Sequence, residues 1–209
     1  MSLKTGGTVA KSLNEDGFRD RLKVRLLQVA ETILAAEGLS AVQARRIATE
    51  ADCSVGTIYN IFGDIDGLIL AANERTLHDL GRILTVAARR AANSDLKARL
   101  MALATAYLDF ATANRLRWRA VFEHRLPDTK EVPEAYVNDR RALLALIANQ
   151  LESTITGPEA RSDASHALFS AVHGIVLLSL DAKLGPFEPS TCERQIRFVV
   201  EHVVAGLKS

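Results

Sequence analysis

Residues 51–62 read ADCSVGTIYNIF, and this stretch decides how the N-terminal part of the chain folds. A short apolar helix ends at Ala51, a polar turn follows, and a second helix opens with Ser54 as its N-cap. The second helix keeps Gly56 near its start, although glycine inside a helix costs about 1 kcal/mol relative to alanine. Because glycine has no Cβ, its presence indicates a surface that another molecule can approach closely.

The two helices around this turn have the layout of a helix-turn-helix. Helical spacing directs one apolar set toward a core, namely Ile47, Ala48, Ala51, Ile58 and Phe62. The opposite face of the second helix offers hydroxyls, backbone N–H groups, an amide and methyl groups, which suit phosphate oxygens and base edges. Its residues are Ser54, Val55, Gly56, Thr57, Tyr59 and Asn60. The alternative interpretation is a helical hairpin without a nucleic-acid partner.

The other long segments also show the apolar spacing of amphipathic helices, and none alternates with the period of a strand. Turn signals such as Pro127-Asp128 and Gly157-Pro158 separate them. We therefore expect an all-α protein of about nine helices, with two short ones within 43–62 and longer ones over 18–37, 64–91, 95–113, 116–125, 133–153, 162–184 and 191–208. Asp64 is placed to cap the helix over 64–91.

Composition limits the class of protein. The 209 residues are 48% hydrophobic and 24% charged with a net charge of +1, which fits a globular chain. The basic cluster over residues 19–25 is typical of a solvated helix face. Residues 1–17 lack the apolar run of a signal peptide and no run of 18 apolar residues exists, so we expect a flexible tail and no membrane partner. Cys53 and Cys192 lie far apart, which is typical of reduced thiols in a cytoplasmic protein.

No motif for a metal, a cofactor or catalysis is recognisable. His166 and His173 are seven residues apart, which separates them by about 10.5 Å along a helix, too far to share one ion. No Ser/His/Asp or Cys/His arrangement, nucleotide-binding loop or paired acid motif appears. We therefore expect no metal site, no cofactor and no catalytic residues.

The last two helices carry more apolar surface than the terminal helices of a monomer need. Residues 162–184 are apolar nearly all the way round, and residues 191–208 carry a broad apolar stripe. We expect a second copy of the chain to pack there, through Phe169, Val176, Leu180, Ile196, Val199, Val200 and Val203. The alternative is a helix threaded through the centre of its own domain.

Residues 38–69, GLSAVQARRIATEADCSVGTIYNIFGDIDGLI, resemble the DNA-binding domain of TetR-type transcriptional regulators. The match has no gap and includes Gly38, Ile47-Ala48, Ala51, Ser54, Gly56, Tyr59, Phe62 and Leu68. The resemblance implies a DNA-binding domain over 18–66 and a helical effector-binding and dimerisation domain over 67–209. It also implies that Arg45 reads a base, that Arg46 reaches phosphate or solvent, and that the DNA-binding residues are Gln43, Arg45, Arg46, Ser54, Val55, Gly56, Thr57, Tyr59 and Asn60.

Three positions depart from the family pattern. Ile65 stands where the family commonly has a phosphate-anchoring Lys, which removes one DNA contact. Gln43 replaces the usual Ser or Thr and is a poorer cap. Asn60-Ile61 replaces an aromatic-His pair, so we expect a different operator sequence from those of well-known members.

Two segments farther along, RLRWRAVFEH (115–124) and LFSAVHGIVLL (168–178), resemble a TetR subgroup named for Trp, His and Gly, here Trp118, His173 and Gly174. The resemblance implies a dimeric helical domain with a pocket for a small apolar molecule. We expect this pocket to involve Tyr107, Trp118, Phe122, Tyr136, His173 and Leu177. The alternatives are that the aromatic residues and His173 only fill a core, and that Gly174 lets another helix pack closely.

We therefore predict a homodimeric DNA-binding transcriptional regulator, a repressor that a small apolar effector releases from a near-palindromic operator in double-stranded DNA. Two recognition helices about 34–36 Å apart fit successive major grooves. The continuous helix over 64–91 starts beside the DNA reader, so a ligand that tilts it changes that separation. The rival functions are an architectural DNA binder without an effector and an enzyme in the C-terminal domain.

Overall fold

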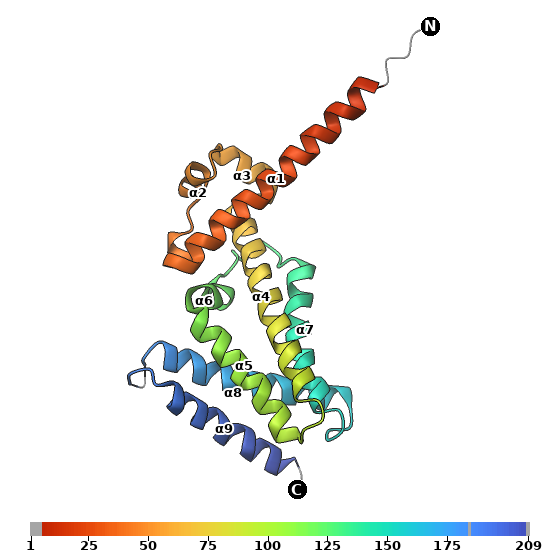
Figure 1. Ribbon diagram of the computed structural model, residues 1–209, viewed down its shortest axis with the longest axis vertical. Coiled ribbons are helices and arrows are strands. Elements are labelled where there is room, and N and C mark those ends of the chain that lie inside the picture. Colours follow the sequence, from red (N-terminus) through yellow and green to blue (C-terminus); the bar gives the residue numbers. More distant parts are fainter. Residues whose placement is uncertain (1–5, 184, 208–209) are drawn as a thin grey trace.

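The computed structural model describes residues 6–183 and 185–207, with side-chain detail from residue 17 onward, and the regular elements within this range are helical (Figure 1). Its nine α-helices, counted over those residues, are α1 (Gly6–Glu37), α2 (Ala44–Glu50), α3 (Val55–Phe62), α4 (Ile65–Arg90), α5 (Leu96–Ala113), α6 (Arg115–Glu123), α7 (Glu134–Gln150), α8 (Pro158–Leu180) and α9 (Pro189–Gly206). A short 3₁₀ turn, η1 (Leu39–Ala41), follows α1. The predicted all-α architecture is confirmed.

Most helices begin and end close to the predicted residues, and α1 is the main exception. It begins at Gly6, so residues 6–17, which we expected to form a flexible tail, continue the helix; residues 1–5 lie outside the described residues. No proline interrupts this stretch, so nothing in it breaks the backbone hydrogen-bond pattern. α8 begins at Pro158 rather than at residue 162, because proline is accommodated in the first turn of a helix.

The N-terminal helices enclose a core of their own. α1, α2, α3 and the first turns of α4 contribute Leu26, Ala30, Ile33, Leu34, Ile47, Ala48, Ala51, Ile58, Leu68, Ile69 and Ala72. The predicted core residues Ile47, Ala51 and Ile58 are completely buried. Gly63, with φ of 83°, ends α3 and allows the chain to turn by 63° into α4. This turn fixes the angle between the second helix of the helix-turn-helix and the long helix that follows it.

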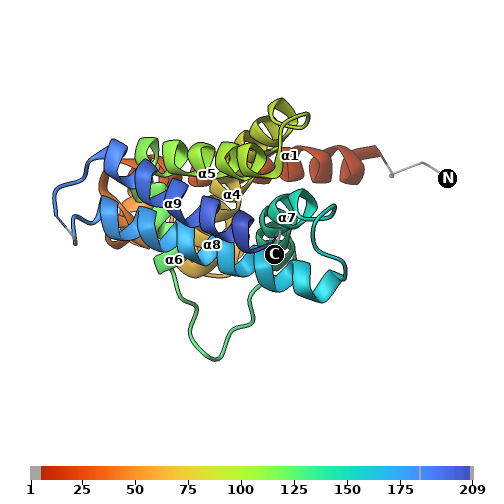
Figure 2. The same ribbon diagram turned by 90° about the horizontal axis from the view of Figure 1, so that it is seen from below.

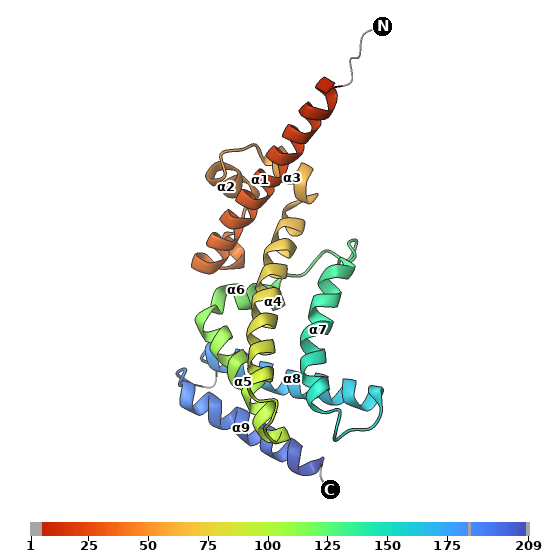
Figure 3. The same ribbon diagram turned by 45° about the vertical axis from the view of Figure 1, so that its right-hand side comes forward.

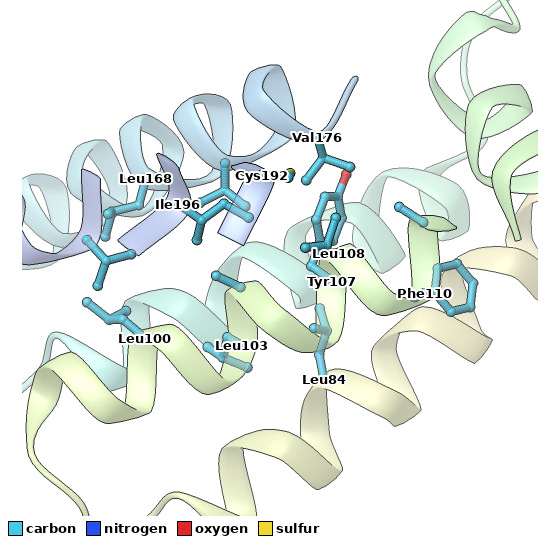
Figure 4. Packing of buried hydrophobic residues seen from close by; sticks show 14 of the residues in the cluster. Leu84, Leu100, Leu103, Tyr107, Leu108, Phe110, Leu168, Val176, Cys192 and Ile196 are labelled. Carbon is cyan, nitrogen blue, oxygen red and sulfur yellow. The ribbon is translucent and has the colours of Figure 1, made fainter. Parts of the chain in front are cut away.

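A second, larger core fills the C-terminal region, and α5 lies at its centre. Leu100 and Tyr107 of α5 point toward side chains of α8 and α9, while Leu103 lies on the side of α5 that faces Leu84 of α4 (Figure 4). α8 and α9 lie side by side at the end of the molecule opposite α2 and α3 (Figures 1 and 2). The single helix α4 therefore runs from the first core into the second.

Side-chain burial corrects the prediction for α8 and α9. Four of the residues expected to face a partner chain are buried in the core of their own chain: Val176, Leu180, Ile196 and Val200. Phe169, Val199 and Val203 are half-buried. One stripe of each helix therefore packs into the core of its own chain, where α5 covers residues that we assigned to a partner, while the opposite faces stay exposed. The large apolar side chains that remain exposed on these helices include Leu178, 42% exposed, and Phe198, 62% exposed.

Candidate nucleic-acid interface and effector cavity

The exposed face of α3 carries the residues predicted to read DNA. Ile58 anchors the helix in the first core, and Tyr59 on the adjoining face is 47% exposed. Ser54, Gly56 and Asn60 are also exposed, while Val55 and Thr57 are half-buried. The helix lies beside α1 and α2, far from α8 and α9 (Figures 1 and 3). This face is therefore free of the chain's own interior, as a groove-reading helix requires.

The N-terminus of α3 is organised by two hydroxyls. Ser54 Oγ accepts a hydrogen bond from the backbone N–H of Thr57 at 3.2 Å, so the predicted N-cap is confirmed. Ser54 Oγ and Thr57 Oγ1 also lie 2.9 Å apart, and one donates to the other. One hydroxyl hydrogen is used within this pair and the other stays available. The pair holds both side chains at the helix end that attracts phosphate.

Gly56 lies on this face without being required by the fold. A Cβ added there has only Ser54 Oγ within 4 Å, at 3.6 Å, which is an ordinary van der Waals distance. Its backbone is helical, so alanine can adopt the same conformation. Nothing inside the described chain therefore explains the glycine, and close approach of a partner from outside does.

The two neighbouring arginines of α2 have different surroundings. Arg46 donates from NH1 to Glu37 at 2.9 Å and from Nε to Glu50 at 2.9 Å, and these partners raise the pKa of the guanidinium. We expected Arg46 to reach phosphate or solvent; here two carboxylates pair with its guanidinium, and a contact with phosphate stays a prediction. Arg45 is exposed, and its side chain makes no hydrogen bond or ion pair with the described residues. Arg45 is the cation of α2 that remains free for DNA.

Gln43, the remaining predicted contact, occupies the N-cap position of α2. Its side chain forms no capping hydrogen bond, as we expected from the residue type, and it is exposed. The amide is therefore free to reach a partner, at the expense of a weaker start to α2.

An ion cluster joins the start of α4 to the connection between α6 and α7. Asp64 caps α4 as predicted, accepting from Gly67 N at 3.0 Å. Lys130 pairs with Asp64 and lies 2.7 Å from Asp66, and it lowers the pKa of both carboxyls. His124 Nε2 lies 3.2 Å from the other oxygen of Asp66. No sequence motif predicts this cluster, because the two aspartates lie about sixty residues from His124 and Lys130 along the chain.

The cluster changes the meaning of the family departure at Ile65. Ile65 in place of the usual lysine was expected to remove one phosphate contact, and two acids, Asp64 and Asp66, flank this position. In the structure the connection between α6 and α7 supplies Lys130 to the same place (Figure 3). Both aspartates are therefore already paired with Lys130 of the same chain.

An apolar cavity of about 50 Å³ lies within the second core. Its walls come from α4, α5, α7, α8 and α9 and consist of Leu80, Leu84, Leu100, Leu103, Ala104, Tyr107, Leu143, Leu146, Ile147, Leu168, Phe169, Val172 and Val200. Of the residues predicted to line a pocket, only Tyr107 does so. Ligand pockets usually enclose about 300–1,000 Å³, so this cavity admits a small molecule only if its walls move apart.

Three other predicted pocket residues form an aromatic cluster around Tyr107. Trp118 Nε1 donates to the Tyr107 hydroxyl at 2.9 Å, and that hydroxyl lies 2.7 Å from His173 Nδ1. Because indole only donates, the hydroxyl oxygen accepts from Trp118, and it donates its own hydrogen to Nδ1 when the ring proton of His173 is on Nε2. Burial lowers the pKa of His173, which agrees with a neutral ring. Phe122 contacts His173 in a tilted arrangement, with ring centres 4.3 Å apart and ring planes at 50°.

The last two predicted pocket residues lie elsewhere. Tyr136 is buried in a small cluster with Leu77 and Val121, where its hydroxyl donates to the Val121 carbonyl at 3.4 Å. Leu177 is half-buried against the second core and does not line the cavity. Gly174 does not accommodate a helix of this chain, since an added Cβ has no described atom within 4 Å. Helical spacing alone does not distinguish these positions from the cavity wall.

Comparison with known proteins agrees with this architecture. Residues 26–72 match the bacterial regulatory proteins of the tetR family, and residues 100–203 match the tetracyclin repressor-like C-terminal domain. The HTH-type transcriptional regulator BetI of Burkholderia mallei is 30% identical over 166 residues, which cover 77% of this chain and 83% of that protein.

Two solved structures share the fold. One is a protein of unknown function from Rhodococcus sp. RHA1, with a TM-score of 0.72 and 25% identity over 90% of this chain and 96% of that one. The other is the multidrug binding protein EbrR complexed with imidazole, with a TM-score of 0.61 and 18% identity over 86% and 93% of the two chains. The matched helix-turn-helix, the matched C-terminal domain and the conserved architecture together show that this chain belongs to the TetR family of DNA-binding transcriptional regulators.

Proposed function

We infer that the protein is a cytoplasmic repressor that binds a near-palindromic operator as a homodimer and leaves it when a small apolar molecule enters the C-terminal domain. The observation that carries the DNA-binding part is the exposed face of α3, where the fold does not require Gly56. On the neighbouring helix α2, the exposed Arg45 side chain has no partner among the described residues. In this role Arg45 reads a base, while Ser54, Thr57 and Tyr59 hold the phosphate backbone.

Selection of bound fragments from random DNA tests this assignment. We expect an enriched sequence with two-fold symmetry whose half-site centres are about one helical turn apart. Tyr59→Ala should weaken binding to the selected and to unrelated fragments alike, because a phosphate contact carries no sequence information. Selection of no sequence at all would favour the rival function of an architectural DNA binder.

The effector part of the proposal rests on the position of the apolar cavity. Its walls include Leu80 and Leu84 of α4, the helix that begins next to the recognition helix α3. A ligand that enlarges the cavity must push against α4, and a coupling free energy of about 1–3 kcal/mol is enough to weaken operator binding five- to 150-fold. The Tyr107 hydroxyl links Trp118 Nε1 to His173 Nδ1 through two hydrogen bonds, and this link also supports the assignment to the Trp-His-Gly subgroup.

Trp118 gives a direct probe for the effector, since it is the only tryptophan of the chain and contacts the cavity residue Tyr107. A metabolite that changes its fluorescence and also releases labelled operator is a candidate effector. A compound that saturates the fluorescence change but leaves operator affinity unaltered would argue against the coupling.

The homodimer is proposed from the outer surfaces of α8 and α9. α8 is long and apolar enough to cross a membrane by length and composition alone, and only 28% of its most apolar stretch is buried within the chain. The open space above Gly174 and the exposure of Leu178 and Phe198 leave room for a second copy. Sedimentation should show a dimer for the wild type and a shift toward monomer for Phe198→Asp, which places a charge in the interface.

A further inference from the structure

Three side chains that the DNA-binding and effector roles leave unused converge between α4 and α7. Glu74 and His78 lie one turn apart on α4, and Asp139 belongs to α7. Their ligand-type atoms all lie within 4.8 Å of one another. Asp139 follows His78 by 61 residues, so no motif in the sequence indicates this group. The prediction of no metal ligands therefore did not consider it.

The contact between His78 and Asp139 is close but is not a well-formed hydrogen bond. His78 Nε2 lies 3.1 Å from Asp139 Oδ2. That oxygen is shielded from solvent and accepts no hydrogen bond of good geometry from any described residue. A buried carboxylate oxygen without a hydrogen-bond donor is unfavourable, and a bound cation at this position compensates its negative charge.

The separation of His78 from Asp139 fits two ligands of a single metal ion. Nitrogen and oxygen ligands bind Zn²⁺ at about 2.0–2.2 Å, so two ligands of one tetrahedral ion are separated by roughly 3.3–3.6 Å. The separation of His78 Nε2 from Asp139 Oδ2 is close to that value. Residues one turn apart on a helix can bind one ion, as in the HExxH motif, and a carboxylate oxygen of the half-buried Glu74 lies within 4.8 Å of the ligand atoms of the other two residues.

The site also has an entry path. His78 and Asp139 line an open groove of about 890 Å³ between α4 and α7, and the side chain of His78 is 59% exposed. α4 and α7 pack against each other along this groove (Figure 3). An ion from solvent can therefore reach His78 and Asp139 without opening either core.

We propose that Glu74, His78 and Asp139 form a binding site for a divalent first-row transition-metal ion such as Zn²⁺, which bridges α4 and α7. The imidazole selects against Mg²⁺, which binds oxygen ligands in octahedral geometry. Three protein ligands leave one tetrahedral position for water. The bound ion ties α4 to the C-terminal domain next to the cavity wall formed by Leu143 and Leu146.

Calorimetric titration of the tag-free protein with Zn²⁺ tests the site. We expect one ion per chain for the wild type, no binding of Mg²⁺ at the same concentrations, and at least tenfold weaker Zn²⁺ binding for Glu74→Gln, His78→Ala and Asp139→Asn. His166→Ala is the matched control, because His166 is an exposed histidine on α8 outside the site, and it should bind like the wild type. Circular dichroism confirms that each variant is folded.

Thermal unfolding tests the site independently of calorimetry. Zn²⁺ should raise the melting temperature of the wild type and of His166→Ala but not that of His78→Ala, because an ion that binds only the folded state stabilises it. Co²⁺ should show the visible absorption of a tetrahedral site in the wild type only when His78 is present. Absence of saturable Zn²⁺ binding, or unchanged affinity in any of the three ligand variants, overturns the site and leaves an ion pair between His78 and Asp139. These readouts do not involve DNA, so they are independent of the proposed function.

Discussion

A Cβ added at Gly67 lies 2.1 Å from the carbonyl oxygen of Phe62, whereas at Gly56 the nearest atom is Ser54 Oγ at 3.6 Å. Gly67 is therefore required by the close approach of the start of α4 to the end of α3. Gly56 is compatible with a side chain as far as the described fold is concerned. The two glycines belong to neighbouring helices, yet the fold requires Gly67 and does not require Gly56.

Alanine substitutions at these two positions should have opposite effects. We expect Gly67→Ala to destabilise the protein by about 1–3 kcal/mol, as overpacking usually does. Gly56→Ala should stabilise it by up to about 1 kcal/mol through helix propensity, while operator affinity falls because the methyl group keeps DNA at a distance. Urea unfolding and fluorescence anisotropy with labelled operator measure the two quantities. A Gly56→Ala variant that binds operator like the wild type would remove the argument from this glycine.

Arg45 and Arg46 form a matched pair for testing base readout. Arg45→Ala should relax the preference at one base pair of each half-site, a discrimination worth about 1–3 kcal/mol for a bidentate contact with guanine. Arg46→Ala should leave the sequence preference unchanged, since Arg46 is engaged by Glu37 and Glu50. Selection experiments repeated with both variants compare the preferences position by position. Equal changes in both would show that the ion pairs of Arg46 open on DNA.

At the scale of elements, Lys130 fixes the connection between α6 and α7 to the first turn of α4. It accounts for the lowered pKa of Asp64 and Asp66 more than any other group. A carboxyl whose pKa is depressed by folding stabilises the folded state above its unfolded pKa, about 3.9 for Asp, and loses that contribution as the pH falls through its folded pKa. The bridge is therefore intact at neutral pH and opens in acid.

Lys130→Met should make stability less dependent on pH below about pH 5. Without Lys130 the carboxyls titrate closer to their unfolded pKa, so acidification removes less free energy of unfolding. Urea unfolding of wild type and variant, measured in steps from about pH 6 down to about pH 3, gives the two slopes. Lys97→Met serves as the control, since Lys97 forms an exposed ion pair with Glu201 and contacts neither Asp64 nor Asp66. Identical slopes for Lys130→Met and the wild type would contradict the bridge.

At the scale of the whole molecule, α4 contributes several turns to each of the two large cores, and the short helix α6 contributes Trp118 to one and Ala120 to the other. The first turns of α4 pack in the N-terminal core, and Asn73 donates to the Ala120 carbonyl of α6 at 3.1 Å. Its later turns supply Leu80 and Leu84 to the cavity. A displacement of the cavity wall can therefore be transmitted along α4 to α3, because side chains of α4 pack in both cores. This supports a rigid-body change of the DNA-reading helices.

Filling the cavity should hold the protein in its DNA-binding arrangement. Ala104→Val adds two methyl groups toward a space of about 50 Å³, which is expected to stabilise the fold by up to about 1 kcal/mol. We expect the variant to bind operator like the wild type and to need more effector for release. Ala102→Val on the same helix, outside the cavity wall, controls for the substitution itself. Unchanged effector sensitivity of Ala104→Val would place the effector elsewhere.

Local sequence signals determined much of this protein. The helical period, the caps at Ser54 and Asp64, and the apolar set of Ile47, Ala51 and Ile58 act over a few residues, so they could be read without a structure. The same signals located the exposed face of α3, because a helix with one buried stripe has only one other face to offer.

Tertiary structure decided which of several equivalent surfaces meets which neighbour. A helix that is apolar all round, such as α8, contains no local information about whether Val176 faces its own core or a partner. Likewise, the pairing of Arg46 with Glu37, of Lys130 with Asp66, and of His78 with Asp139 depends on elements that come together only in the folded chain. Charges and apolar stripes act through distance in space, and the chain order fixes that distance only within a single helix.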